Sequence, residues 1–326
     1  MFLEDVIIEG FKSFSIKTEM GFQPGISVIV GNNGVGKSNI LDAIVWALGE
    51  NDLGRLRCLD RQELFFAGSE NCPPAQRVSV ELRFRHEKGA ATPGLNIRRE
   101  LERNGPDRFF LDDHACSPDQ VSKTLAAHRL HQSLKTIVRQ ERINDLLLVD
   151  PDERLEMVCA LLKLPSTAGF DASLQNAIDE TFRRYMLHLV PDGAVALKLI
   201  SHNGRRGIDL VITLPGNRTR KAHQLSGGEK AVASLALKLA LFRQLENPFF
   251  LLDEVEPSLD YSHHKSMQAF LKAVATDTQL IMITHLRSTI ELADTLHGVR
   301  TRWDGSSFMK FYFDMDERLL RLYKCC

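Results

Sequence analysis

A glycine-rich octapeptide near the N-terminus has the residue types that bind phosphate. Residues 31–38 read GNNGVGKS and fit the P-loop pattern G-x-x-x-x-G-K-[ST]. Gly31, Gly34 and Gly36 would let backbone N–H groups turn towards phosphate oxygens. An apolar run, residues 25–31, precedes the loop, and apolar residues at helical spacing follow it. A P-loop needs this strand, loop and helix context, so the octapeptide predicts a nucleotide site.

Two side chains of this loop would act on the phosphates directly. Lys37 would bring a positive charge to the β- and γ-phosphates, and the Ser38 hydroxyl would ligate Mg²⁺. The alternative is a glycine-rich turn that contains Gly-Lys-Ser by chance, and the correct flanking elements disfavour it. The other residues expected to surround the nucleotide here are Asn32, Asn33, Val35 and Asn39.

An acidic pair follows a second apolar run. Residues 249–252 read FFLL and lead directly into Asp253 and Glu254. Open α/β sheets bind ligands beyond the carboxyl ends of their strands. Asp253 is therefore predicted to hold Mg²⁺ through water, and Glu254 to polarise the water that attacks the γ-phosphate. The alternative, an ordinary acidic exit from a strand, is disfavoured by the preceding P-loop.

Two further residues could complete the catalytic set. His285 ends the apolar run LIMITH and is predicted to sense the γ-phosphate, although a lone histidine there is more often only a polar exit residue. Gln140, within TIVRQERINDLL, could offer its amide oxygen to Mg²⁺ and its NH₂ group to the attacking water. A lone glutamine in a charged loop is more often a surface residue.

A second glycine-rich turn, Ser226–Gly228, opens the helical run LSGGEKAVASLALKLAL. A helix N-terminus is a ready phosphate site, yet one γ-phosphate does not need two such sites from one subunit. The economical arrangement places the P-loop of one copy and the Ser226–Gly228 turn of another on the same ATP. An ordinary capping box, with Ser226 as N-cap and Glu229 three residues on, would explain the serine and the glutamate but not Gly227 and Gly228.

Composition narrows the class of protein. The chain has 326 residues, a net charge of −1, 44% hydrophobic and 25% charged residues, which is typical of a soluble globular protein. No apolar run is long enough for a membrane span, and the acidic N-terminus lacks a secretory signal. Six scattered cysteines without a CxxC pair make a zinc site or disulfide framework improbable. The expected setting is a reducing cytoplasm.

The order of the elements predicts an α/β fold. Residues 3–9 alternate like a strand, and strand patterns at residues 77–111 indicate an antiparallel patch. The second half alternates helices and strands as a parallel layer does. Residues 194–200 and 207–215 read as a hairpin. Helices are expected at residues 37–48, 120–130, 152–164, 171–189, after Ser226 and from about residue 262. Further strands are expected at residues 248–254 and 278–285, and two late strands run to residue 314.

Seven segments, taken in order, resemble the ABC-type ATPase head of SMC (structural maintenance of chromosomes) proteins. They are GFKSF (10–14), GNNGVGKSNILDAIVWALGE (31–50), LFFAGSE (64–70), RQERINDLL (139–147), LSGGEKAVASLALKLAL (225–241), LLDEV (251–255) and ITHLRSTIELADTLHGV (283–299). The resemblance implies two lobes with a mixed, largely parallel core sheet, an antiparallel β patch and flanking helices. It also implies an ATPase whose two heads, copies of this chain or a related head, enclose two ATP and Mg²⁺.

The resemblance carries roles onto matching positions. Lys37 and Ser38 match phosphate and Mg²⁺ contacts, and Ser226–Gly228 match the contact made from the other head. Four further matches are Gln140 for the Q-loop, Asp253 and Glu254 for Walker B, and His285 for the switch histidine. Arg57 falls where the family has an arginine that reaches the α-phosphate region, with Arg55 the weaker candidate. Lys12 and Ser13 would lie near the nucleotide.

The resemblance also frames the domains. Residues 1–165 would form an N-terminal lobe and 172–326 a C-terminal lobe, with 166–171 as a short linker where SMC proteins insert a coiled-coil arm and hinge. This short linker is expected both of a natural relative without the arm and of a head from which the arm has been removed. Residues 256–260, EPSLD, depart from the usual D-loop Asp-Ala-Ala-Leu-Asp and put the rate tuning across the dimer in doubt.

Partners follow mainly from the resemblance. DNA, a kleisin-type subunit, a nucleoid location and a role in chromosome organisation, segregation or repair are implied, with no membrane partner. Two basic stretches, residues 77–108 and 205–221, could contact DNA, although basic strands are more often merely solvated. The alternatives are a RecF-like repair ATPase, a non-hydrolysing dimerisation switch, and a transporter ATPase subunit.

Overall fold

The computed structural model describes residues 1–86, 94–139, 145–190, 193–202, 204–214, 218–255, 264–315 and 319–322. Gln140 and the D-loop at 256–260 lie outside these ranges. Within them, no helix is long and apolar enough to span a membrane.

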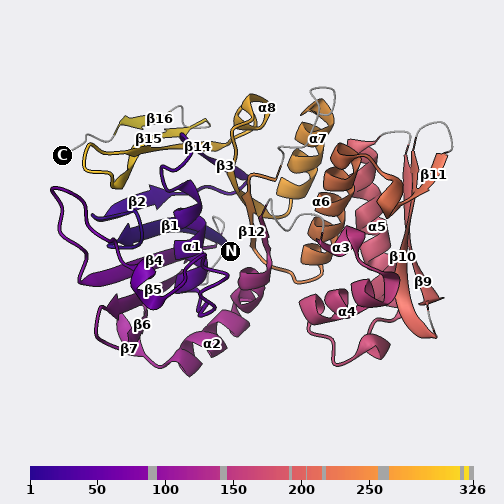
Figure 1. Cartoon of the computed structure of the whole chain (residues 1–326), viewed down its shortest axis with the longest axis horizontal. Coiled ribbons are helices and arrows are strands. Elements are labelled where there is room, and N and C mark those ends of the chain that lie inside the picture. The colour runs from indigo at the N-terminus through magenta and orange to yellow at the C-terminus, as the bar shows by residue number, and fades with distance from the viewer. Residues whose placement is uncertain are drawn as a thin grey trace. The chain divides into compact units, whose positions relative to one another are not determined.

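The chain forms two compact units (Figure 1). Unit 1 comprises Met1–Thr136, Pro248–Leu251 and Thr278–Cys326, and unit 2 comprises Ile137–Asn247 and Leu252–Asp277. These units group residues by spatial proximity. The two units do not correspond to the two lobes predicted on either side of residues 166–171. Those lobes stay a prediction.

One sheet of unit 1 is antiparallel and confirms the predicted β patch. Its order is β2-β1-β4-β5-β6-β7, and alternating burial along β4 indicates one packed face. The short β2 and β7 were not predicted, because strands of four and three residues carry too little periodicity. The strands are β1 (Phe2–Glu9), β2 (Thr18–Gly21), β4 (Arg77–Arg85), β5 (Leu95–Glu102), β6 (Asp107–Leu111) and β7 (His114–Cys116).

A second sheet carries the strands next to the P-loop and confirms the mixed α/β layer. β3 pairs in parallel with both β13 and β14, and β14 pairs antiparallel with β15. All of β13 is buried, as expected of a parallel strand covered on both faces. The part of this sheet described with unit 1 runs β16-β15-β14-β3-β13-β12. Its strands are β3 (Ile26–Val30), β12 (Phe249–Asp253), β13 (Gln279–Ile283), β14 (Thr295–Thr301), β15 (Ser307–Asp314) and β16 (Leu319–Leu322).

Helix α1 (Lys37–Ala47) follows β3 directly, as the sequence predicts. Its apolar side is buried, and Trp46 packs against Phe11 with ring centroids 5.6 Å apart. Burial of this face fixes the helix whose first turn carries Lys37 and Ser38. The other helices of unit 1 are α2 (Pro118–Ala127) and the short α8 (Arg287–Ile290).

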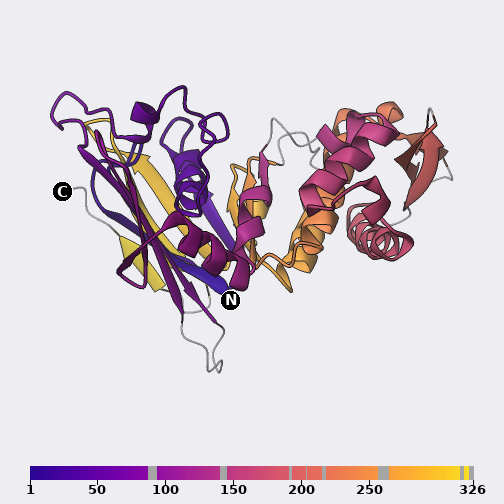
Figure 2. The ribbon, with the colours of Figure 1, turned by 90° about the horizontal axis from the view of Figure 1, so that it is seen from below.

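Unit 2 combines helices with a three-stranded sheet of order β11-β10-β9. Helix α5 packs on β9, where Gln175 donates to the Leu197 carbonyl at 2.9 Å and Asp179 accepts from the Leu197 N–H at 2.7 Å. Figures 1 and 2 both show this sheet gathered on one side of the helices of unit 2. The elements are β8 (Ile137–Arg139), α3 (Asp145–Leu148), α4 (Pro151–Leu162), α5 (Ala172–Leu189), β9 (Ala194–His202), β10 (Arg205–Leu214), β11 (Arg218–Lys221), α6 (Gly227–Arg243) and α7 (His264–Ala275).

The segment predicted as a linker is packed rather than extended. Phe170 is fully buried, and Asp171 caps α5 by accepting from the Leu174 N–H at 2.8 Å. Arg206 of β10 donates to the carbonyls of Thr167 and Phe170 at 3.0 and 2.9 Å. Residues 166–171 are therefore a compact connection between α4 and α5.

A buried histidine should make the fold sensitive to acid. His297 of β14 lies between Phe22 and Tyr312, with ring centroids 4.7 and 5.2 Å away, and neither ring nitrogen has a hydrogen-bond partner among the described residues. Desolvation lowers the pKa of His297 from 6.5 to about 3. The unfolded chain therefore takes up a proton here as the pH falls below 6.5, while the folded chain does not, so stability is lost on acidification.

Replacing His297 by leucine removes this proton uptake. Chemical denaturation at pH 7 and pH 5 should show that the wild type loses about 2 kcal/mol more stability between the two pH values than His297→Leu does. Other titrating groups, including Asp5, whose pKa burial raises to about 6, are common to both proteins. Equal acid sensitivity of the two would contradict the neutral buried state of His297.

Candidate nucleotide-binding site

The P-loop glycines are required by backbone shape and close approach. Gly34 and Gly36 have φ of 79° and 93°, in the left-handed region that disfavours other residues. A Cβ on Gly36 would lie 2.3 Å from the Ser13 hydroxyl oxygen, and one on Gly31 would lie 2.5 Å from the Val299 carbonyl oxygen. The loop therefore packs tightly against neighbouring segments and turns into α1 as a phosphate loop must.

Lys37 lies folded over the loop. Its ammonium donates to the carbonyl oxygens of Gly31 and Asn32, each at 3.0 Å, and the residue is 6% exposed. The charge is thus held beside the backbone that would surround the phosphates. Ser38 follows in the first turn of α1. On the other side of the loop, Ser307 donates to the Val35 carbonyl at 2.6 Å.

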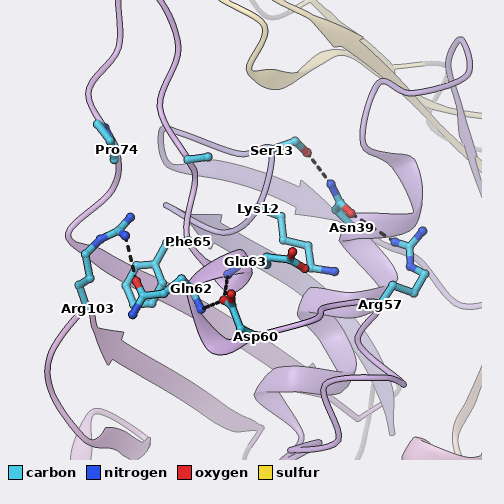
Figure 3. A pocket seen from close by; sticks show the side chains of 11 residues that line it. Lys12, Ser13, Asn39, Arg57, Asp60, Gln62, Glu63, Phe65, Pro74 and Arg103 are labelled. Atoms are coloured by element: carbon cyan, nitrogen blue, oxygen red, sulfur yellow. Dashed lines mark hydrogen bonds between the residues drawn. The ribbon is translucent and has the colours of Figure 1, made fainter.

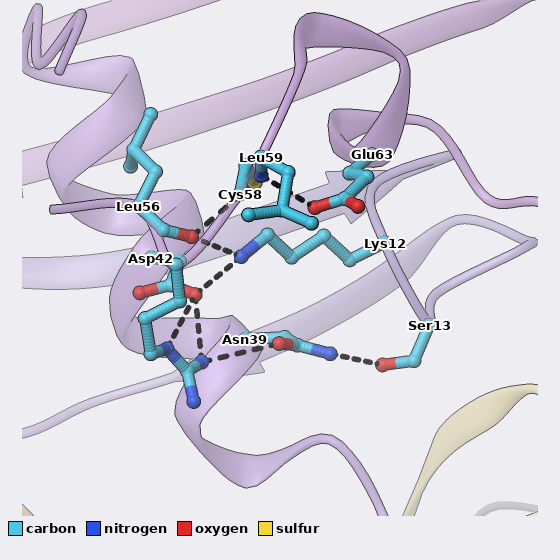
Figure 4. Close-up of polar contacts among 9 residues, drawn as sticks. Lys12, Ser13, Asn39, Asp42, Leu56, Cys58, Leu59 and Glu63 are labelled. Atoms are coloured by element: carbon cyan, nitrogen blue, oxygen red, sulfur yellow. Dashed lines mark hydrogen bonds and ion pairs between the residues drawn. The ribbon is translucent and has the colours of Figure 1, made fainter. Parts of the chain in front are cut away.

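The residues predicted around the nucleotide from resemblance converge beside this loop (Figure 4). Asn39 donates to the Ser13 hydroxyl at 2.8 Å, and Arg57 donates to the Asn39 amide oxygen at 3.2 Å. Lys12 and Arg57 both contact the carboxylate of Asp42, the nearest nitrogen of each lying at 2.6 Å. Residues from three separate segments thus form one polar cluster.

This cluster forms one wall of a pocket of about 630 Å³ (Figure 3). The other wall includes Gln62, whose amide oxygen accepts from Arg103 at 2.9 Å, and Phe65, beneath the same guanidinium. The sequence analysis assigned no role to this second wall, although Phe65 and Ala67 lie in the matched segment LFFAGSE (64–70). The lining residues are Lys12, Ser13, Asn39, Arg57, Asp60, Gln62, Glu63, Phe65, Ala67, Pro74 and Arg103.

Only one of the two candidate arginines lines the pocket. Arg57 lines it, whereas Arg55 is not among the lining residues. Arg55 instead pairs with Glu50 at 3.3 Å and with Asp52 at 3.7 Å. Arg57 remains the candidate for contact with the nucleotide.

The acidic pair and the histidine lie at strand ends, as predicted. Asp253 ends β12 and is 8% exposed. Glu254 follows with φ of 49°, a strained backbone for glutamate and one that clusters at functional sites. His285 is exposed just beyond β13. Asp253 and Glu254 belong to unit 2 and His285 to unit 1.

The Ser226–Gly228 turn opens α6 with the alternative capping box fully formed. The Ser226 hydroxyl accepts from the Glu229 N–H at 3.3 Å, and the Glu229 carboxylate accepts from the Ser226 N–H at 2.7 Å. The cap does not explain Gly227, because a Cβ there would have no atom of the described chain within 4 Å. Ser226 and Gly227 are exposed, so packing within the chain does not require this glycine.

The two basic stretches differ in how their charges are used. Between residues 77 and 108 the guanidinium groups of the described arginines are largely paired with carboxylates. Arg99 pairs with Asp107 and is only 2% exposed, so its side chain is too buried to contact DNA. On β10 and β11, by contrast, Arg205 and Lys221 are exposed. The ion pairs of the first stretch are Arg77–Glu100, Arg83–Glu81, Arg83–Glu19, Arg85–Glu4, Arg98–Asp113 and Arg108–Glu102.

The architecture and motifs agree with comparisons to known proteins. The family model for the RecF/RecN/SMC N terminal domain matches residues 2–307. An SMC head domain from Thermotoga maritima is 32% identical, with 95% of this chain and 98% of that one covered and a TM-score of 0.72. The chain belongs to the SMC family of ATPase heads. This membership favours the SMC interpretation over the RecF-like and transporter alternatives.

Other SMC relatives match different shares of their length. A solved Smc head bound to the C-winged helix domain of ScpA is 28% identical, with 98% of this chain and all of that one covered and a TM-score of 0.87. The chromosome partition protein Smc of Lactiplantibacillus plantarum is 34% identical over 169 residues, which is 50% of this chain. That match covers 14% of the relative's length, so the chain corresponds to the head part of such proteins.

Proposed function

We propose that this SMC head binds Mg²⁺ and ATP and hydrolyses ATP when two heads engage. The observation that carries the proposal is the P-loop itself. Lys37 lies 3.0 Å from two of the loop's carbonyl oxygens, next to a pocket of about 630 Å³ lined by Lys12, Ser13, Asn39 and Arg57. A phosphate loop that adjoins a polar pocket with lysine and arginine side chains in its lining suits a nucleoside triphosphate.

The proposed roles follow from the chemistry of each side chain. Lys37 and the loop N–H groups bind the β- and γ-phosphates. Ser38, Gln140 and Asp253 offer the hard oxygen ligands that suit Mg²⁺, which would neutralise phosphate charge when bound. Glu254 orients the attacking water and accepts its proton, and His285 contacts the γ-phosphate. Residues Gly31–Asn39 and Arg57 make the remaining proposed contacts with the nucleotide.

The proposed dimer uses the exposed Ser226–Gly228 turn. A turn with an exposed helix N-terminus and a glycine that its own chain does not require suits close approach by a ligand held elsewhere. We propose that this ligand is ATP on the P-loop of a second copy or a related head. Residues 1–165 and 172–326 would then act as two lobes of one head, joined at 166–171.

Turnover at different protein concentrations tests this proposal. If lone heads hold incomplete sites, the rate per subunit should rise with protein concentration until the dimer saturates. Rates over a hundredfold range, with sedimentation of the same samples in ATP and ADP, measure this. A measurable rate that is constant throughout would overturn the shared site, and absence of hydrolysis with ATP-dependent dimers would favour a non-hydrolysing switch.

The relatives suggest the setting in which such a head works. Curated relatives are named chromosome partition proteins, and one solved head carries the C-winged helix domain of ScpA. By analogy, we propose a role in chromosome organisation, segregation or repair, with a kleisin-type subunit and DNA as partners and the nucleoid as location. The kleisin would be tested by co-purification with a ScpA-like C-terminal domain.

DNA contact, if it occurs on β10 and β11, should be strongly dependent on salt. Arg205 and Lys221 are exposed there, and Arg220 lies 3.8 Å from Glu229. Replacing Arg205, Arg220 and Lys221 by glutamine should weaken binding to duplex DNA and reduce the log–log salt slope by about 0.9 for each lost phosphate contact. Arg206 is left intact because it holds Thr167 and Phe170.

The matched control replaces an equal number of basic residues in the other basic stretch. Arg77, Arg85 and Arg108 pair with carboxylates, so Arg77→Gln, Arg85→Gln and Arg108→Gln together should leave the slope unchanged. Fluorescence anisotropy from 50 to 200 mM salt measures both variants. A larger loss in this control than in the β10–β11 variant would transfer the contact to the antiparallel sheet.

A further inference from the structure

Asp42, a buried carboxylate on the P-loop helix, has no role assigned to it from the sequence. It lies in the second turn of α1 and is fully buried. One oxygen, Oδ2, accepts from Lys12 Nζ at 2.6 Å, from Arg57 Nη2 at 2.6 Å and from Arg57 Nε at 3.1 Å (Figure 4). Buried charges are costly unless paired, and here one carboxylate serves two cations.

The two cations come from different loops with unusual backbones. Lys12 lies between β1 and β2, and Arg57 lies in the segment after α1. Their φ values are 47° and 55°, the left-handed region that non-glycine residues rarely adopt. Such conformations persist where the surroundings hold them. Asp42 joins both loops to α1, and Lys12 strengthens the junction by also donating to the Leu56 carbonyl.

The side chains of Lys12 and Arg57 both face the pocket. Lys12 and Arg57 line the cavity of about 630 Å³, whereas Asp42 does not. The Arg57 side chain is 39% exposed and the Asp42 side chain 0%. Asn39 accepts a hydrogen bond from Arg57 and donates one to Ser13. The carboxylate therefore acts on whatever occupies the pocket only through the two cations that it orients.

We propose that Asp42 is a positioning residue, which fixes Lys12 and Arg57 in the orientation that receives the anionic part of the nucleotide. This inference rests on the proposed function, since it takes the pocket as the nucleotide site. Charge-assisted hydrogen bonds of this kind are shorter and stronger than bonds between neutral groups. Without the carboxylate, both cations would lose their common anchor before the ligand arrives.

A double-mutant cycle tests the proposal by titration calorimetry with ATP. Asp42→Asn keeps the side chain's shape, and we expect it to weaken ATP binding by about tenfold, as loss of charge-assisted contacts can. Arg57→Ala should weaken binding by a similar factor, and the double variant by little more than either one. Losses that multiply, or normal binding by Asp42→Asn when Arg57→Ala binds weakly, would overturn the proposal.

A second variant keeps the test independent of folding at position 42. Arg57→Lys retains the charge but cannot make the two-nitrogen contact to Asp42, so it should bind ATP as weakly as Arg57→Ala. Binding equal to wild type would mean that charge alone matters and would overturn the proposal. Failure of the wild type itself to bind ATP would instead reject the proposed function, which separates the two conclusions.

Discussion

Replacing Lys37 by alanine is expected to weaken ATP binding by about 10- to 100-fold, because the change removes the charged donor held over the phosphate loop. Ser226→Arg should bind ATP as the wild type does, yet fail to dimerise and hydrolyse. Lys37 lies against Gly31 and Asn32, whereas Ser226 heads the exposed N-terminus of α6. Calorimetric titration with ATP compares the two variants directly.

Thermal unfolding without nucleotide is the control for this pair. The Ser226 hydroxyl caps α6, so Ser226→Arg should cost about 1 kcal/mol of stability, whereas Ser226→Asp retains the cap and adds a negative charge where phosphate would approach. Both Ser226 variants should bind ATP normally and fail to dimerise. An equal loss of ATP binding in the Lys37 and Ser226 variants would place the Ser226 turn in the same subunit's site.

Glu254→Gln should lower the hydrolysis rate by about 10²- to 10⁴-fold while preserving ATP binding. The glutamine amide can still orient a water molecule but cannot accept its proton, and general base catalysis has effects of this size. Single-turnover hydrolysis with excess protein measures the chemical step. The left-handed backbone of Glu254, with φ of 49°, suggests Glu254→Gly as a companion that relieves strain but also lacks the base.

The companion variant separates backbone strain from chemistry. If backbone strain alone mattered, Glu254→Gln, which keeps the strain, would hydrolyse ATP as the wild type does, and only Glu254→Gly would be slow. The proposed role requires both to be slow. A Glu254→Gln rate within a factor of a few of the wild type would assign the base to another residue.

The elements beside the P-loop were predictable because their signals are local. The apolar runs of β3 and β13 and the helical spacing of α1 each fit one period, and β1, α5 and α6 were predicted in the same way. The shape of the phosphate loop followed from its glycines. The short strands β2, β7 and β16 were not predictable, because strands of three or four residues carry too little periodicity, although each pairs with the strand just before it.

The pocket wall and the state of individual charges required the structure. Asp42 stands among apolar residues in NILDAIVWA, and a charge on the buried face of a helix was a signal that could have identified it. Its partners Lys12 and Arg57 are 30 and 15 residues away. Likewise, the arginines of residues 77–108 look like a basic surface in sequence, but cross-strand carboxylates neutralise most of them.

The measurement that tests the central claim most directly is the mass of Glu254→Gln by light scattering during size-exclusion chromatography with saturating ATP and Mg²⁺. The claim that two heads share each ATP predicts twice the subunit mass in ATP and a single subunit in ADP. It also predicts a single subunit in ATP when Ser226→Arg is added to Glu254→Gln. A Glu254→Gln protein that remains a single subunit in ATP, or a double variant that still doubles its mass, would contradict the claim.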